Sequence, residues 1–115
     1  GDGIVMNLAD IQIETLSQHA SQAAELLKVL ANEQRLLLLC RMKHGECPVN
    51  ELVELSGMSQ SNVSQHLARI RGSGVVDTRR DGTTIYYRLA NDDIKAIIDM
   101  LCDRFGPQGA KTASN

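Results

Sequence analysis

The stretch that decides the fold is residues 52–89, LVELSGMSQSNVSQHLARIRGSGVVDTRRDGTTIYYRL. A short helix runs into it, because Val49, Leu52 and Val53 follow the i, i+3, i+4 spacing of one apolar helix face. The helix is predicted to stop just before Gly57. Glycine adopts the positive φ that a tight turn between two helices requires, so a second helix should follow directly.

The second helix is predicted over residues 60–71, with the Ser59 hydroxyl as its N-cap. At about 100° per residue, Val63, Leu67 and Ile70 cluster on one side, which we expect to be buried. The opposite side collects polar and small residues: Ser61, Ser64, Gln65, Ala68 and Arg69. Such side chains suit a DNA major groove, where Gln pairs with adenine, Ala touches a thymine methyl and Arg reaches guanine or phosphate.

A β-hairpin is predicted next, because the sequence alternates on both sides of Asp81-Gly82. This dipeptide is a strong hairpin signal, since a type I′ turn needs positive φ at both central residues. A turn at this place predicts the cross-strand pairs Arg80–Thr83, Thr78–Ile85 and Val76–Tyr87. One face of the ribbon is then apolar and packs on the helices, with Val76, Ile85, Tyr87 and Leu89. The other face presents Arg79, Thr84, Tyr86 and Arg88.

Two helices followed by a hairpin with a basic tip predict a winged helix-turn-helix, a mainly α fold with a small β-hairpin. Arg79 and Arg80 protrude near the tip, where phosphate is their natural partner. The net charge is −2, yet residues 60–90 hold five arginines and two acids, whereas residues 1–30 hold four acids and one lysine. Since positive charge is concentrated on the reading module, the sequence favours double-stranded DNA as the partner.

The whole chain has 115 residues with 43% hydrophobic content, which predicts one small domain over residues 7–105. Residues 1–6 are expected to be a disordered N-terminus or a remnant of expression, and residues 106–115 a flexible tail. No apolar run reaches the length of a membrane span and no signal peptide precedes the fold, so a cytoplasmic protein with no membrane partner is expected. Three cysteines, an odd number, argue against a secreted disulfide framework.

Further helices are predicted on both sides of this module, which makes five in all. The first follows helical spacing from Ile11 to Leu30. The second is predicted over residues 33–43, with Asn32 as its N-cap. Its LLLLC centre is apolar nearly all round and must be buried on more than one side. The last helix is capped by Asn91. Because the winged unit cannot cover both terminal helices, we expect a homodimer through the first and last helices rather than a monomer. Two reading helices roughly 34 Å apart would then match a palindromic operator.

The runs ELLKVLANEQRLLLLCRM (25–42) and VNELVELSGMSQSNVSQHLARIRGSGVVDTRRDGTTIYYRL (49–89) resemble the ArsR/SmtB family of bacterial winged-helix repressors, in particular its HlyU/BigR/SqrR/NolR-like branch. With the closing helix, the resemblance covers about residues 20–106. It implies a dimeric repressor that occludes promoters and commonly controls its own gene. It also implies DNA contacts at Ser59, Gln60, Ser61, Ser64, Gln65 and the wing arginines, in agreement with the residues themselves.

In that branch, a cysteine ending the second helix pairs with one near the end of the last helix, and oxidation or persulfide formation releases DNA. Cys40 matches the first position, but the second falls on Gly106, and Cys102 lies one helical turn, about 6 Å, earlier. Because a disulfide needs Cα atoms within roughly 7 Å, two interpretations stay open. One is a redox or sulfur switch at Cys40 and Cys102, and the other is inert packing. Cys47 is expected on an exposed loop with a secondary role.

The metal sites of the wider family are missing from this chain. Pro48 and Asn50 stand where one site needs thiolates, and no histidine follows Asp93 where the other needs Asp and His. No metal or other cofactor is therefore predicted. One alternative is a zinc or arsenite site with at most three ligands from Cys40, His44 and Cys47.

The leading hypothesis is a dimeric, sequence-specific repressor that is released from DNA by thiol chemistry at Cys40 and Cys102. The alternatives are a constitutive repressor without inducer, a metal-sensing repressor, and a protein-interaction winged helix that never touches DNA. The last would have no need of the outward polar row and its positive charge. An enzyme is not expected, because His19, His44 and His66 lie far apart and no nucleophile motif or glycine-rich phosphate loop occurs.

Overall fold

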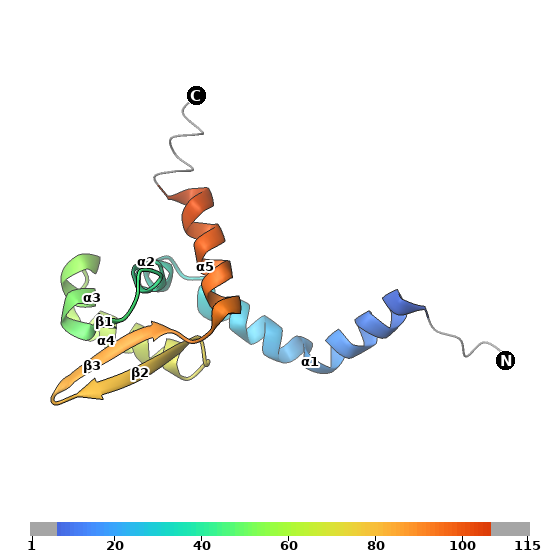
Figure 1. Cartoon of the computed structure of the whole chain (residues 1–115), viewed down its shortest axis with the longest axis horizontal. Helices are drawn as coiled ribbons and strands as arrows, with labels where there is room; N and C mark the ends of the chain where they lie inside the picture. Colours follow the sequence, from blue (N-terminus) through green and yellow to red (C-terminus); the bar gives the residue numbers. More distant parts are fainter. Residues whose placement is uncertain (1–6, 107–115) are drawn as a thin grey trace, which may run out of the picture.

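The structure is a computed structural model that describes residues 7–106. In this part of the chain it has five helices and three short strands (Figure 1). In chain order they are α1 (Leu8–Leu30), α2 (Glu33–Met42), β1 (Cys47–Pro48), α3 (Val49–Ser56), α4 (Gln60–Arg71), β2 (Val76–Asp81), β3 (Thr84–Leu89) and α5 (Asp92–Phe105). The predicted winged helix-turn-helix with five helices is confirmed. The disorder expected at residues 1–6 and in the tail from residue 107 onward lies outside the described residues.

Short polar side chains start the helices where the sequence predicts them. Asn32, Ser59 and Asn91 each accept a hydrogen bond from the backbone N–H three residues later, at 3.0, 3.1 and 3.0 Å. Gly57 ends α3 with a φ of 70°, the left-handed conformation that the turn into α4 requires. The local signals therefore place the end of α3 and both ends of α4 where the sequence predicts them.

The hairpin register differs from the prediction by two residues. Asp81 pairs with Thr84 and Val76 with Leu89, so the turn is made by Gly82 and Thr83. A turn centred on Asp81-Gly82 would need positive φ at Asp81, and among the described residues only glycines have it. Gly82, with a φ of 64°, takes the first central position, as in a type II′ turn. Because the slip is two residues, the two faces of the ribbon stay as predicted.

A third strand was missed in the sequence. β1 pairs antiparallel with β3, Cys47 opposite Tyr87, which gives the sheet order β1-β3-β2. The predicted exposed loop at Cys47 is therefore wrong: the residue is 0% exposed and belongs to the core. A strand of two residues carries no alternation, so no periodic signal could reveal it.

The core lies between the helices and the inner face of the sheet. It contains residues of every helix and all three strands, among them Leu38, Leu39, Leu52, Val63, Leu67, Ile70, Val76, Tyr87 and Ile98. The LLLLC centre of α2 is only partly buried, since Leu37 is 61% exposed. The predicted burial on more than one side is thus incomplete within a single chain.

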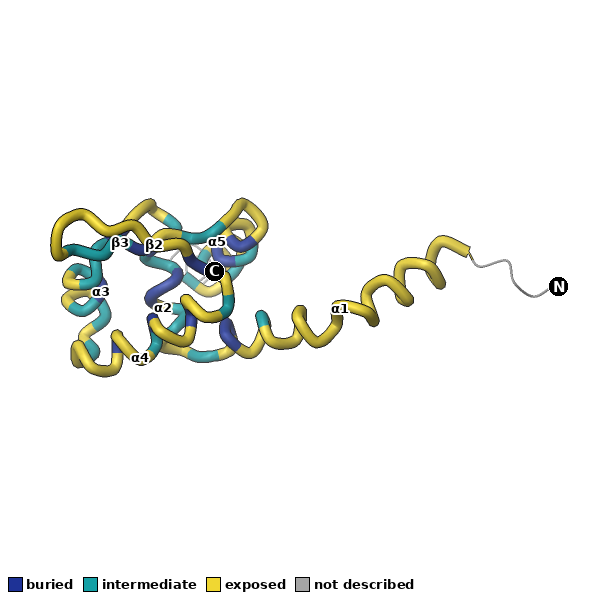
Figure 2. The backbone as a smooth tube through the Cα atoms, turned by 90° about the horizontal axis from the view of Figure 1, so that it is seen from below, coloured by how far each residue is buried: buried dark blue, intermediate teal, exposed yellow. Residues whose placement is uncertain are grey.

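Helix α1 projects from this body (Figures 1 and 2). Only its last two residues, Val29 and Leu30, are buried. Large apolar side chains along the projecting part are exposed: Leu8, Ile11, Ile13, Leu16 and Leu27. No helix among residues 7–106 is both long and apolar enough to cross a membrane.

Candidate functional site

The outward face of α4 is fixed by the residues on its opposite side. Val63, Leu67 and Ile70 are 0–2% exposed, so their packing sets the rotation of the helix. That rotation exposes the whole row read from the sequence, together with the residues at the start of the helix: Ser59, Gln60, Ser61, Ser64, Gln65, Ala68 and Arg69. These side chains offer hydrogen-bond donors and acceptors and one methyl group on a single solvent-facing surface, the chemistry of major-groove readout.

The flank of α4 is tied to α2 by polar contacts. His66 Nε2 donates to Gln34 Oε1 at 2.7 Å, and Arg35 lies 3.5 Å from His66 Nδ1. Arg35 also donates to the backbone oxygens of Lys28 and Val29, at 3.1 and 2.6 Å, in the last turn of α1. The start of α2 therefore connects α1 with α4.

Arg69, predicted to contact DNA, is engaged within the chain. Its guanidinium donates to Glu25 Oε1 of α1 at 2.6 Å. This hydrogen bond, with the arginine charge, holds the pKa of the exposed Glu25 below its ordinary value. A DNA phosphate would have to compete with this carboxylate for Arg69.

The two arginines of the wing, the hairpin formed by β2 and β3, differ from each other: one is paired with a carboxylate and the other is not. Arg79 makes a two-pronged contact with Glu46, at 2.9 and 2.8 Å, and stacks over the Tyr86 ring 4.5 Å from its centroid. The hydrogen bond from Arg79 lowers the pKa of Glu46. Arg80 is exposed and forms no ion pair with any described residue. It is therefore the wing cation that phosphate can reach without displacing a carboxylate.

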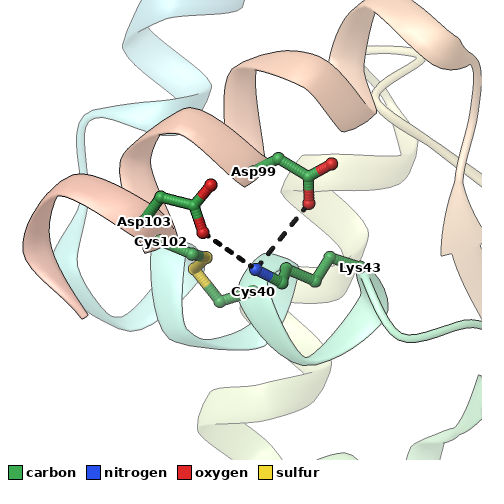
Figure 3. Close-up of a disulfide and its surroundings, with 5 residues drawn as sticks. All are labelled: Cys40, Lys43, Asp99, Cys102 and Asp103. Carbon is green, nitrogen blue, oxygen red and sulfur yellow. Dashed lines mark ion pairs between the residues drawn. A yellow bond between two sulfur atoms is a disulfide. The ribbon is translucent and has the colours of Figure 1, made fainter. Parts of the chain in front are cut away.

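The last turn of α2 and the second half of α5 form a junction that carries the two paired cysteines. Cys40 and Cys102 are joined in a disulfide within one chain, with their Cα atoms 6.4 Å apart (Figure 3). Gly106, the position expected from the family, instead caps α5, donating its N–H to the Cys102 oxygen at 2.7 Å. Beside the disulfide, the Lys43 ammonium lies 3.8 Å from Asp99 Oδ1 and 3.7 Å from Asp103 Oδ1 (Figure 3).

A largely apolar cavity of about 770 Å³ opens at this junction. Both cysteines line it, with Leu36, Leu37, Leu101 and Phe105 as apolar walls and Lys43, His44 and Asp103 as polar ones. Its volume is in the range of small-molecule sites. A small reagent can therefore reach the cysteine pair in a single chain.

Cys47 has the opposite environment. Its thiol donates to Glu51 Oε2 at 3.0 Å, and Arg41 donates to the same oxygen at 3.0 Å. Burial, followed by the hydrogen bond to Glu51, raises the pKa of Cys47 to about 12. The alternative metal site of Cys40, His44 and Cys47 is not assembled, and no group of three or more His, Cys, Asp or Glu side chains within residues 7–106 is placed to hold a metal ion.

Comparison with known proteins gives a consistent assignment. The family model described as "bacterial regulatory protein, arsR family" matches residues 32–78. The transcriptional activator HlyU of Vibrio cholerae is 39% identical over 93 residues, which are 81% of this chain and 86% of that protein. The biofilm growth-associated repressor of Agrobacterium fabrum is 38% identical over 96 residues, 84% of this chain and 82% of the repressor.

Solved structures agree with the sequence comparison. Reduced HlyU from Vibrio cholerae superposes with a TM-score of 0.75 at 38% identity, over 81% of this chain and 98% of the other. A homodimeric winged helix-turn-helix DNA-binding domain from Mycobacterium bovis, a possible ArsR-family regulator, gives 0.69 at 32% identity, over 74% and 79%.

Proposed function

Because the chain belongs to the ArsR family of DNA-binding transcription regulators, we propose that it is a dimeric repressor whose operator affinity falls when Cys40 and Cys102 are oxidised. The observation that carries the switch is the disulfide across the α2–α5 junction, with both residues lining an open cavity. The sensing chemistry is two-electron oxidation of the two thiols, either by a disulfide reagent to this disulfide or by an inorganic polysulfide, which accepts the electrons and also supplies the sulfur atom that bridges the two cysteines.

Sequence-specific reading is assigned to the exposed row on α4. Gln65 and Ser61 supply hydrogen bonds to base edges, and Arg80 supplies a phosphate contact from the wing. Ser59 acts mainly through its cap, because its hydroxyl already accepts from the Asn62 N–H at 3.1 Å. Arg69 and Arg79 join the interface by exchanging a carboxylate for a phosphate.

The dimer is proposed to form through α1 and α5, because both helices carry exposed apolar residues, Met100 and Phe105 among them on α5. Leu8, Ile13 and Leu16 are 76%, 67% and 56% exposed in the single chain. Burial against a second copy would remove this apolar surface from water, which is favourable in free energy. The similar domain from Mycobacterium bovis is homodimeric, which supports a dimer here. A twofold dimer presents two α4 helices to a palindromic operator, as the geometry of helix-turn-helix dimers requires.

The route from the cysteines to DNA runs through α2. Cys40 lies in its last turn, and Arg35 and Gln34 in its first turn contact His66 of the reading helix and the end of α1. A change in how α5 docks on α2 can therefore shift both α4 and α1, which contact the first turn of α2. The disulfide-bonded structure corresponds, in this proposal, to the released state.

The test compares operator affinity of the oxidised and reduced protein. Fluorescence anisotropy with the DNA directly upstream of the chain's own gene should give about 5- to 150-fold weaker binding after oxidation, the usual range of allosteric coupling. Cys102→Ser, treated with the same oxidant, should keep the reduced affinity. Equal affinity in both states would refute the switch and leave a constitutive repressor. Equal binding of this DNA and a scrambled duplex would refute the repressor itself.

A further inference from the structure

Helix α5 has fully buried residues only in its first half, and in its second half Cys102 is partly buried against the core. Ile94 and Ile98 are 6% and 0% exposed, whereas residues 99–105 include no buried residue. Two links join this second half to α2: the disulfide and the ion cluster around Lys43. Reduction breaks the first link and leaves the charges that make the second.

The ion cluster and the cysteines connect the same two helix turns (Figure 3). Cys40 and Lys43 lie three residues apart at the end of α2, and Cys102 lies between Asp99 and Asp103 on α5. The two aspartates are an i, i+4 pair of like charges, which repel each other unless a cation lies between them. The side chains of Lys43, Asp99 and Asp103 are 20%, 42% and 72% exposed, so solvent screens the attraction of Lys43 to Asp99 less than its attraction to Asp103.

We infer that Lys43, held between Asp99 and Asp103, docks the second half of α5 on α2 in the reduced protein and so sets the effective concentration of the two thiols. This rests on the proposed function only in that it concerns the same cysteine pair. Lys43 is thus a positioning residue for disulfide formation.

The chemistry shows which step depends on position. With glutathione disulfide as oxidant, one protein thiolate attacks a reagent sulfur and forms a mixed disulfide, which releases one glutathione thiolate. The second protein thiolate then attacks the protein sulfur of the mixed disulfide and releases the second glutathione. Two protein thiols are oxidised and one reagent disulfide is reduced to two thiols, which take up, through solvent, the two protons that the protein thiols lose. Only the second attack depends on how close α5 holds its cysteine to α2.

The experiment equilibrates the full chain with reduced and oxidised glutathione, quenches with acid and measures the disulfide fraction by alkylation and mass spectrometry. Lys43→Gln should lower the equilibrium constant for the Cys40–Cys102 disulfide about three- to fivefold, the size expected of a partly exposed ion pair. Lys43→Arg should restore it. Lys95→Gln removes the same charge from an exposed site on α5 that has no ion pair among the described residues, and should leave it unchanged. Equal constants for Lys43→Gln and wild type would overturn the inference.

A double variant separates position from charge. Asp99→Asn/Asp103→Asn removes the ion pairs and leaves Lys43 in place, so a positioning role predicts the same loss as Lys43→Gln. If Lys43 acted only by stabilising a thiolate, loss of the two acids would instead speed mixed-disulfide formation and leave the equilibrium constant undiminished, which would overturn the inference. Hydrogen exchange of residues 99–105 in the reduced protein should be faster in Lys43→Gln. The disulfide equilibrium constant and the hydrogen exchange rates are measured without DNA, so their outcome does not depend on whether the repressor proposal is correct.

Discussion

The reading unit (α3, α4 and the wing) and the α2–α5 junction are held together by different means. In the reading unit, Leu52, Val63 and Leu67 are 0–2% exposed, and apolar burial fixes the rotation of α4. At the junction, a disulfide and the Lys43 ion cluster join two helix ends beside a cavity of about 770 Å³. Oxidants form a disulfide and reductants break it, whereas the packing of apolar side chains contains no bond on which these reagents act. In the proposed function, the molecule thus separates a fixed surface that reads DNA from a junction that responds to oxidants.

The largest expected contrast is between the junction cysteines, Cys40 and Cys102, and Cys47, which lies in β1 and is buried beside β3 of the wing. The pKa of Cys47 is raised from the ordinary 9.0 to about 12, so its thiolate population at a given pH below 9 is about a thousandfold smaller than that of an ordinary thiol. In freshly reduced native protein at pH 8, iodoacetamide should therefore label Cys40 and Cys102 at least a hundredfold faster than Cys47. Peptide mass spectrometry over time measures the three rates.

Unfolding in urea provides the control for this contrast, since all three cysteines should then react at similar rates. Labelling of Cys47 in native protein as fast as that of Cys102 would contradict the separation of a fixed and a responsive region.

The next contrast is in stability. Leu67→Ala opens a cavity in a fully packed site and should lower the free energy of unfolding by about 2–5 kcal/mol. Leu101→Ala, at a half-buried position that already lines the junction cavity, should cost only about 1 kcal/mol. Urea denaturation of both variants in the oxidised state makes the comparison. Equal losses would show that the junction is packed as tightly as the reading unit.

The sequence predicts the parts of the fold that depend on local patterns and misses those that depend on pairing between distant segments. The helix-turn-helix follows local rules, and the caps at Ser59 and Asn91 and the turn at Gly57 are found as predicted. The hairpin register was wrong by two residues, because the sequence does not show which turn position Gly82 takes. The burial of Cys47 was missed since it depends on a two-residue strand pairing with β3.

The candidate site was predictable where periodicity decides it and not where distant residues meet. The exposed face of α4 follows from the buried Val63, Leu67 and Ile70 stripe. The contact of Arg79 with Glu46, 33 residues apart, depends on how β1, which directly follows Glu46, pairs with the hairpin. The pairing of Cys40 with Cys102 likewise depends on how α5 crosses α2, which no local pattern specifies.

A third contrast tests function within the reading unit. Gln65→Ala removes an exposed side chain and should leave the urea midpoint unchanged. It should weaken operator binding by about 1–3 kcal/mol per half-site, because a Gln contact to adenine is lost. Arg80→Ala should instead weaken binding to every duplex and reduce the salt dependence by about one phosphate contact per subunit. Anisotropy titrations at several salt concentrations distinguish the two, and a uniform loss with Gln65→Ala would remove this residue from base readout.

The smallest contrast concerns Glu46, which holds Arg79 at the edge of the wing. Glu46→Gln weakens that hold and frees the guanidinium for phosphate, so affinity for any duplex should rise about two- to threefold at low salt. Glu14→Gln, on the projecting part of α1, removes the same charge far from the wing and is the matched control. A rise of equal size in both variants would mean that only net charge matters.

The same pair gives a dependence on pH with a defined sign. Because Arg79 lowers the pKa of Glu46 in the folded chain, the stabilisation by this pair is fully present above the ordinary glutamate pKa of 4.5. It is lost as the pH falls through the lowered folded value, where the carboxylate takes up its proton. Urea midpoints measured from pH 7 down to pH 3 should therefore fall less steeply for Glu46→Gln than for wild type or Glu14→Gln. Parallel curves would show that Arg79 is not bound to Glu46 in solution, and the wing would then present two equally free arginines to DNA.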